Sequence, residues 1–458
     1  MFAIDVLWLQ WIGGFAAMIM MFVNGLWNGW TSPYLAQFES GNSPFPVTTN
    51  EISWIASINT LGQVPGGILG AIFIEYFGNR RSIVGIGFSL LLSWILVIMA
   101  NSASWIYVAK FISGAASQFS AMGISLFLGD ICSPNIRGAM VTMAFNGVLL
   151  GVLVGNVIGP YISMRIFACI AIVLNIFPIG VFMWLPESPY YLVSKDKLDD
   201  AKRSILRYNP KADVDLEVES IKNFVTTKKS VAFVDRVREF NISRNRKNGL
   251  ILIGLIIFSE CSGLAPLSAY MEIIMIRGSV TVISPATVPV IANSVGLIAA
   301  WTAMYFVEKC GRRIMWAVSS GGICVSMIAL GTHFYLLGSG YDPTILQWLP
   351  ILAVVLFKSW YNLGVSCIPS IALSEIFASN IRTLAACLSS VSSGIFSFIV
   401  IYVYQWLLEL MDEGYVYWIH AVFMAISLMF GWLLVQETKG KTLMEIQSDA
   451  MKDERMGH

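Results

Sequence analysis

Charged residues are scarce in this sequence. They make up 12% of its 458 residues, whereas an ordinary soluble domain contains about 25%. The 29 Lys and Arg and the 28 Asp and Glu nearly cancel, so the chain lacks the basic surface that is typical of nucleic-acid-binding proteins. Hydrophobic residues make up 56% of the chain, which excludes intrinsic disorder and exceeds what a soluble core can hide. The composition therefore indicates a membrane protein with many spans.

The sequence also has few of the residues that catalysis or metal binding would need. His333, His420 and His458 are the only histidines, they lie far apart, and no phosphate-binding loop motif is present. We therefore expect neither an enzyme nor a bound metal or other cofactor. The seven cysteines all fall in predicted spans or at predicted cytoplasmic ends, so no disulfide framework is expected.

Long uncharged stretches predict twelve membrane-spanning helices. Ten stretches contain no charged residue, and two more contain one each: Glu260 in 248–271 and Lys358 in 343–374. About 20 apolar residues are enough for a helix to cross the hydrocarbon of a bilayer. These runs are too long for the alternating strands of a membrane barrel. We therefore predict an all-α membrane protein with twelve transmembrane helices.

The distribution of Lys and Arg predicts the orientation of the chain. If the loops after even-numbered spans face the cytoplasm, 25 of the 29 bases lie on that side, fourteen of them in the segment 187–247. Basic residues are concentrated in cytoplasmic loops of membrane proteins. We therefore expect a multi-pass protein of the cell membrane with both termini in the cytoplasm.

Charged loop residues recur in the two halves of the chain. Arg80 in FGNRR and Arg312 in CGRR are 232 residues apart. The pairs Asp130–Arg137 and Glu375–Arg382 both have a spacing of seven. This recurrence indicates a duplicated six-helix unit. The sequence therefore predicts four parts: an N-terminal six-helix bundle at 1–186, a cytoplasmic linker with short helices at 187–247, a C-terminal six-helix bundle at 248–436 and a cytoplasmic tail at 437–458.

The same loops carry a resemblance to a known family. FGNRR (77–81), LPESP (185–189), EKCGRR (308–313) and ETKGKT (437–442), in this order and after the expected spans, resemble the motifs of sugar porters of the major facilitator superfamily. NGWTSPYLAQ at 28–37 is similar to the insect facilitated trehalose transporter-like members. The resemblance runs from about residue 25 to 446. It implies two pseudo-symmetric bundles that rock around a central substrate site.

Charges at the predicted cytoplasmic helix ends are candidates for a gate. Acids and bases there could hold the two halves together on the inner side and bias the equilibrium between two conformations by a few kcal/mol. The alternative is that the bases only set the membrane topology. The candidate gating residues are Arg80, Arg81, Asp130, Arg137, Glu187, Glu308, Arg312, Arg313, Glu375, Arg382 and Glu437.

The resemblance also implies a substrate site, and this chain departs from the family there. Where span 7 of the family has Q-Q-x-x-G-x-N-x4-Y, this chain reads SECSGLAPLSAY (259–270). Ser370 stands where the family has a tryptophan. For any single position the alternative role is a hydrogen bond between helices. The candidate substrate-binding residues are Gln63, Asn146, Ser259, Glu260, Tyr270, Asn293 and Ser370.

Glu260 and Lys358 are charged residues at membrane depth, where charges usually face a cavity or a partner. Three interpretations remain open for Glu260. It could bind substrate hydroxyl groups, it could pair with Lys358 and take part in proton coupling, or it could form a static bridge with Lys358.

The first predicted span contains no acid between Val6 and Phe38, whereas proton-coupled sugar porters usually carry an aspartate there. The resemblance therefore implies facilitated diffusion of a sugar, trehalose or a hexose. The alternatives are a proton-coupled or non-sugar polar-solute transporter that uses Glu260, and a transporter-like sensor that binds without translocating. Sensors tend to have long cytoplasmic tails, and the tail expected here is short. The expected partners are a small-molecule sugar and the lipid bilayer, with no nucleic acid, and the expected state is a monomer.

Overall fold

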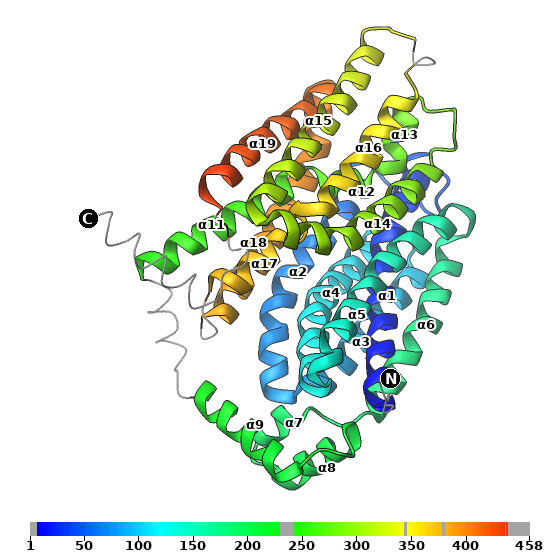
Figure 1. Ribbon diagram of the computed structural model, residues 1–458. Helices are drawn as coiled ribbons and strands as arrows, with labels where there is room; N and C mark the ends of the chain where they lie inside the picture. The colour runs from blue at the N-terminus through cyan, green and yellow to red at the C-terminus, as the bar shows by residue number, and fades with distance from the viewer. Residues whose placement is uncertain (1–6, 230–241, 343–345, 378–380, 436, 438–458) are drawn as a thin grey trace, which may run out of the picture. The chain divides into compact units, whose positions relative to one another are not determined.

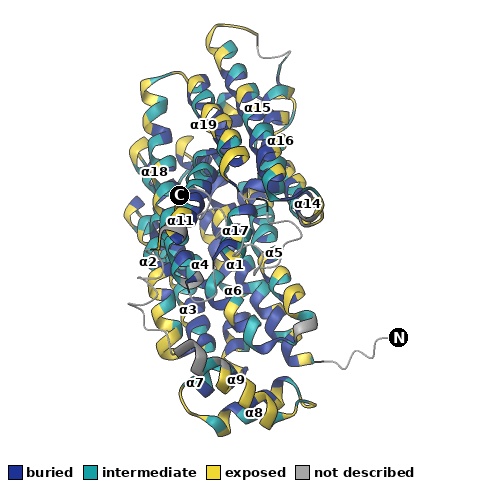
Figure 2. Cartoon of the chain, turned by 60° about the vertical axis from the view of Figure 1, so that its left-hand side comes forward, coloured by how far each residue is buried: buried dark blue, intermediate teal, exposed yellow. Residues whose placement is uncertain are grey.

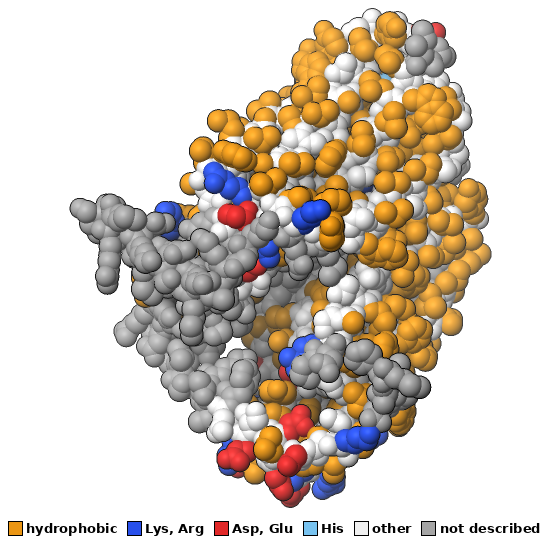
Figure 3. Space-filling model, viewed as in Figure 1, with side chains coloured by type: hydrophobic (Ala, Val, Ile, Leu, Met, Phe, Trp, Pro, Cys, Tyr) orange, Lys and Arg blue, Asp and Glu red, His pale blue; other side chains and the backbone are white. Residues whose placement is uncertain are grey.

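The computed structural model describes residues 7–229, 242–342, 346–377, 381–435 and 437, and helices dominate these residues (Figure 1). Among the described residues, eleven helical runs are long and apolar enough to cross a bilayer, and a shorter apolar helix, Thr287–Ala303, accompanies them. Figure 3 shows hydrophobic side chains over most of the visible helical surface, which is the surface that lipid would cover. The prediction of an all-α membrane protein with twelve spans is confirmed.

The helices follow the predicted spans closely. The first six are α1 (Trp8–Glu39), α2 (Thr49–Phe77), α3 (Asn79–Met99), α4 (Ala103–Ile131), α5 (Pro134–Ile158) and α6 (Met164–Trp184). Three short helices follow: α7 (Pro189–Ser194), α8 (Leu198–Tyr208) and α9 (Val214–Lys229). The later ones are α11 (Ser243–Cys261), α12 (Leu264–Ala269), α13 (Met271–Arg277), α14 (Thr287–Cys310), α15 (Arg312–Gly338), α16 (Trp348–Trp360), α17 (Ile368–Ile376), α18 (Arg382–Leu410) and α19 (Glu413–Leu434).

The chain separates into two compact units. The first comprises Met1–Trp30, Gly41–Glu51 and Ile58–Ala232. The second comprises Thr31–Ser40, Ile52–Ser57 and Phe233–His458. The second unit therefore contains Thr31–Ser40 at the end of α1 and Ile52–Ser57 near the start of α2, in addition to the helices from α11 onwards.

Glycines allow the helices of the first unit to pack with their backbones in contact. A Cβ atom on Gly151 of α5 would overlap the carbonyl oxygen of Phe22 and would lie 2.9 Å from the Cα of Gly25, both on α1. A Cβ atom on Gly62 of α2 would overlap the carbonyl oxygen of Phe111 on α4. Small residues at such crossings maximise van der Waals contact where lipid supplies no hydrophobic driving force.

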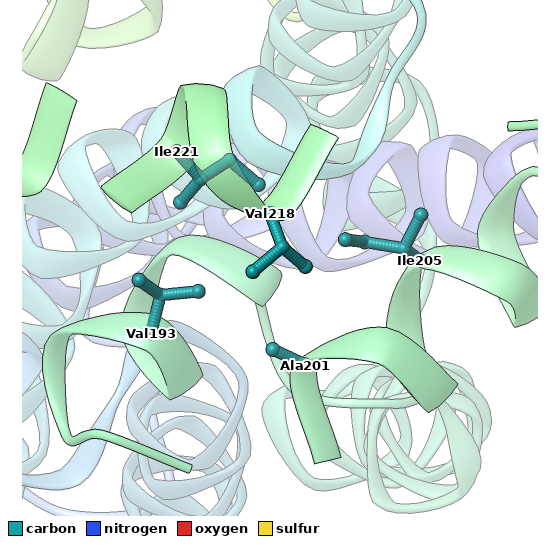
Figure 4. Close-up of a cluster of buried hydrophobic side chains, with 5 residues drawn as sticks. All are labelled: Val193, Ala201, Ile205, Val218 and Ile221. Carbon is teal, nitrogen blue, oxygen red and sulfur yellow. The ribbon is translucent and has the colours of Figure 1, made fainter. Parts of the chain in front are cut away.

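The three short helices α7, α8 and α9 belong to the first unit and pack around a small hydrophobic cluster. Val193, Ala201, Ile205, Val218 and Ile221 are buried together between α7, α8 and α9 (Figure 4), while much of α8 is exposed on the other side (Figure 2). The Tyr208 hydroxyl donates to the carbonyl of Pro186 at 2.8 Å. The amide of Gln10 on α1 donates to the carbonyl of Tyr208 at 3.0 Å. These bonds attach the short helices to the ends of α1 and α6.

Replacing Ile205 with aspartate should detach these helices, because a charge would enter a cluster in which Ile205 is 3% exposed and the burial of an unpaired charge costs several kcal/mol. Faster limited proteolysis between residues 187 and 229 would report the detachment. Leu206→Asp is the matched control, since Leu206 is 46% exposed. Equal cleavage rates in the two variants would contradict the prediction.

Two of the predicted spans are broken in the structure. The predicted span 248–271 divides at Gly263, which has a left-handed φ of +88° and separates α11 from α12. The predicted span 343–374 divides at a π-helical segment, η3 (Tyr361–Val365), between α16 and α17. Pro369 lies in the first turn of α17. Proline is tolerated in the first turn of a helix, because the backbone N–H that it lacks would have no partner within the helix at that position. The break therefore precedes the proline.

Candidate functional site

The turn between α2 and α3 places a carboxylate at a helix N-terminus. Gly78 has a φ of +92°, a conformation that glycine adopts without strain. The backbone N–H of Arg80 donates to Glu187 Oε1 at 2.9 Å, and Arg80 Nε lies 3.8 Å from Glu187 Oε2. The Arg80 guanidinium also donates to the carbonyl of Leu185 at 2.7 Å. A negative charge is stabilised at the positive end of the helix dipole, so Glu187 joins the end of α6 to the start of α3.

The turn between α14 and α15 repeats this arrangement. Gly311 has a φ of +93°. The backbone N–H groups of Arg312 and Arg313 donate to the two carboxylate oxygens of Glu437 at 3.1 and 3.2 Å. The Arg312 guanidinium donates to Glu375 Oε1 on α17 at 2.8 Å. The charge pattern that recurs in the sequence thus corresponds to one geometry built twice.

Asp130, at the end of α4, accepts hydrogen bonds from neutral groups. Its Oδ2 accepts from Asn79 Nδ2 at 2.8 Å and from the Ser188 hydroxyl at 2.5 Å. Burial, and after it the carboxylate of Asp130, raises the pKa of Tyr190, while Arg137 acts in the opposite direction. Asn79 and Ser188 lie inside the FGNRR and LPESP motifs, but the sequence reasoning singled out only their charged neighbours.

The described bonds of the candidate gating residues lie within one unit or the other. They hold the helix ends of each unit in place, whereas the predicted lock between the halves stays a prediction. Arg81 and Arg137 are exposed. Arg313 donates to the carbonyl of Trp432 and lies over its ring at 4.9 Å. The side chains of Glu308 and Arg382 lie outside the described residues.

Glu260 lies near the broken part of span 7, in a group of hydroxyls contributed by three elements. The Ser393 hydroxyl of α18 donates to Glu260 Oε1 at 2.6 Å, and Ser397, one turn later, also bonds the carboxyl. The hydroxyls of Ser259 and Tyr361 lie 3.1 Å apart. We call Ser259, Glu260, Tyr361, Ser393 and Ser397 the Glu260 cluster.

The Glu260 cluster can bind hydroxyl groups, because a carboxylate accepts hydrogen bonds and serine or tyrosine hydroxyls both donate and accept them. The sequence reasoning missed Tyr361. The nearest signal was Lys358, one helical turn before it in the same span.

The hypothesised pairing of Glu260 with Lys358 is wrong for this structure. The Lys358 ammonium donates to the Ser268 hydroxyl at 2.7 Å, and among the described residues Lys358 forms no ion pair. Ser268 lies on α12, beyond the break at Gly263. The break gives Lys358 a partner on α12, while Glu260 remains on α11 and bonds α18.

The other candidate binding residues are scattered over different surroundings. Tyr270 is 1% exposed and its ring centroid lies 5.5 Å from that of Tyr404. The Asn293 amide donates to the carbonyl of Pro289 in its own helix at 2.8 Å, and Ser370 is exposed on α17. Gln63 and Asn146 are half-buried in the first unit. Only Ser259 and Glu260 of the predicted set share one cluster.

Buried polar groups of the first unit mostly join its helices. The amide of Asn24 on α1 donates to the Ser120 hydroxyl of α4 at 3.2 Å and accepts from Ser117 at 2.9 Å. Lys110 of α4 is 1% exposed, with its ammonium 5.4 Å from the ring centroid of Trp30. A cation over an aromatic face is stabilised where both are desolvated. No sequence spacing pointed to Trp30 as the partner of Lys110.

Comparisons with known proteins agree with this architecture. The family model described as "Sugar (and other) transporter" matches residues 6–450. The facilitated trehalose transporter Tret1 of Anopheles gambiae is 28% identical over 97% of this chain and 56% of its own length. Tret1 of Polypedilum vanderplanki is 27% identical over 97% of this chain and 88% of its own. The chain spans about half the length of several of these relatives.

Solved structures show the fold. The inward open conformation of the xylose transporter XylE from E. coli superposes with a TM-score of 0.78 at 18% identity and covers 95% of this chain and 98% of that one. A peptide transporter POT in complex with sulfate has a TM-score of 0.68 at 13% identity and covers 96% of this chain and 95% of that one. The chain therefore has the fold of the major facilitator superfamily.

Proposed function

Because this chain belongs to the family of sugar (and other) transporters, we propose that it carries a sugar, trehalose or a hexose, across the cell membrane by facilitated diffusion. The observation that carries the proposal is the match to this family over residues 6–450, together with relatives named as facilitated trehalose transporters. In alternating access, the two halves expose a central site to one side of the membrane at a time. Substrate gradients alone would set the direction.

The proposed topology places both termini in the cytoplasm and divides the chain into bundles at 1–186 and 248–436. Its support is the concentration of 25 of the 29 Lys and Arg on one side of the predicted spans. The helix-terminal carboxylates of Glu187 and Glu437 then lie at the cytoplasmic ends. We assign them, with Arg80, Arg312 and Glu375, the role of keeping each inner end rigid while the halves move.

The Glu260 cluster is the proposed sugar contact of the second half. Interrupted helices supply binding sites in many transporters, because irregular backbone is tolerated where it lines a cavity. Spans 7 and 10 are interrupted beside this cluster, at Gly263 and at Tyr361–Val365. Sugar hydroxyls would donate to the Glu260 carboxylate in place of the Ser393 hydroxyl.

Purified protein in liposomes tests this function by counterflow of labelled trehalose, glucose and a panel of polyols at two pH values. Exchange of trehalose or a hexose that does not change with pH is the expected result. Glu260→Ala should lower exchange by about ten- to hundredfold, since a hydrogen bond to a charged group contributes ~1.5–3 kcal/mol. Ser294→Ala is the control, because among the described residues the Ser294 hydroxyl bonds only to the carbonyl of Val290 in its own helix. Binding without exchange of any compound would refute transport.

One observation favours a second function. Glu260 bonds hydroxyl groups and, among the described residues, has no basic partner, so it could exchange a proton or contact a different polar solute. In that case a pH gradient would drive accumulation, and Glu260→Gln would abolish the accumulation while leaving exchange intact. The same liposomes distinguish the two functions.

A further inference from the structure

A group of contacts within the second unit joins the end of α1 and the start of α2 to α13 and α18. Arg277 Nη2 lies 2.6 Å from Glu39 Oε1. The backbone N–H of Glu272 donates to the Ser32 hydroxyl at 3.1 Å. The ring of Trp54 packs against those of Phe398 and Tyr402, with centroids 5.9 and 5.3 Å away. Segments that are far apart in the sequence are thus fastened by charge, by a backbone hydrogen bond and by aromatic packing.

Arg277 interacts with a second carboxylate in addition to Glu39. It is also attracted by Glu413, the first residue of α19. The hydroxyls of Tyr404 and Tyr417 donate to Glu413 Oε1 at 3.2 and 2.8 Å. These bonds hold the carboxylate of Glu413 in place. Arg277 is thus bonded to an acid at the end of α1 and attracted by a fixed acid on α19.

The position of Arg277 couples this charge group to the broken part of span 7. Arg277 is the last residue of α13, a helix of seven residues that begins next to Tyr270. The ring of Tyr270 packs on Tyr404, whose hydroxyl bonds Glu413. The side chains of Arg277 and Glu39 are 30% and 38% exposed. Their attraction is therefore screened less than that of a fully exposed pair, which contributes little.

We propose that Glu39, Arg277 and Glu413 form a charge latch that holds α13 against the end of α1 and opens in each transport cycle. The latch rests on the proposed function and topology, which place these residues at the extracellular side. It controls how often the outer entrance is open. In the proposed topology Glu39 belongs to the bundle 1–186, whereas α13 and α19 belong to the bundle 248–436. Opening therefore separates Arg277 from Glu39, while the attraction between Arg277 and Glu413 is kept.

The test measures access to the outer entrance directly. Ser53 is 3% exposed and faces Tyr270, so Ser53→Cys places a reporter thiol that a membrane-impermeant maleimide reaches only when the outer side opens. In liposomes of defined orientation, Arg277→Gln should raise the labelling rate of this reporter about tenfold, and Arg277→Lys, which keeps the charge, should raise it less. The control is Arg165→Gln, which removes an exposed base near another predicted outer helix end and should leave the rate unchanged.

If Arg277→Gln fails to fold, Glu39→Gln removes the same contact from the α1 side and should also raise the labelling rate. Labelling rates in a folded Arg277→Gln or Glu39→Gln variant that equal the parent rate would overturn the latch. An equal rise with Arg165→Gln would overturn it too, because a general loss of positive charge would then explain the effect. Labelling needs no transported solute, so a failure of sugar counterflow leaves this readout intact and the two proposals fail separately.

Discussion

Replacing Gly151 with leucine is expected to abolish the accumulation of folded protein. A side chain at this position overlaps the carbonyl oxygen of Phe22 and approaches the backbone nitrogen of Leu26 to 2.9 Å. Neither backbone group can rotate away as a side chain could, so α1 and α5 must separate. Overpacking destabilises a core whose side chains can rearrange by about 1–3 kcal/mol. Separating two helices along a contact of several turns should lower the stability of the fold by more than that.

The measurement is the monodisperse fraction and the melting temperature of the purified protein in detergent. Gly151→Ala should give an intermediate loss, since its methyl group meets the same carbonyl. Gly180→Leu is the matched control: Gly180 is exposed on α6 and a Cβ there has no neighbour within 4 Å. A Gly151→Leu protein as stable as the control would show that the crossing of α1 and α5 is looser than the structure indicates.

Replacing Gly311 with alanine should destabilise the second unit and reduce transport by at least tenfold. Gly311 has a φ of +93°, and a residue with a side chain is strained by about 1–3 kcal/mol in this conformation. The new Cβ also overlaps the carboxylate of Glu437, which must leave the N–H groups of Arg312 and Arg313. The positive end of α15 then loses its counter-charge.

Two further variants separate backbone strain from the loss of charge. Glu437→Gln leaves the conformation of Gly311 unchanged and weakens the bonds to the N–H groups of Arg312 and Arg313, so it should reduce transport with a smaller drop in melting temperature. Gly338→Ala, at the exposed end of the same helix and with no neighbour near its Cβ, should change neither. Transport by Gly311→Ala at the parent rate would mean that the carboxylate at this helix end has no mechanical role.

Sequence reasoning grouped the charges at the helix ends but could not assign their partners. Glu187 and Glu437 were expected to belong to a set of opposite charges that could lock the two halves together on the inner side, and that lock stays a prediction. The structure shows both carboxylates on backbone N–H groups at the start of α3 and α15, beside glycines with positive φ. Spacing in a sequence shows which charges recur. It does not show whether a carboxylate binds a side chain or a helix N-terminus, because that choice depends on the conformation of one glycine.

Glu260 and Lys358 illustrate a second limit. Both were recognised as charges at membrane depth, and a bridge between them was one hypothesis. Hydropathy treats 248–271 as one span, whereas the left-handed conformation of Gly263 divides it and gives Lys358 a partner on α12. Tyr361 joined the Glu260 cluster through a π-helical turn, which no hydrophobic pattern predicts.

The amino-acid sequence by itself determined that this is a helical membrane protein with twelve spans and that its charged loops occur twice, because a bilayer requires long apolar runs and restricts charge to their ends. The tertiary structure alone decided which polar groups meet. Gly263 and the π-turn at Tyr361–Val365 redirect spans 7 and 10, and the end of α1 reaches α13 through Glu39 and Arg277. Such contacts join residues 133 or 238 positions apart, and only the packing of whole helices brings residues so distant in the chain within hydrogen-bonding reach.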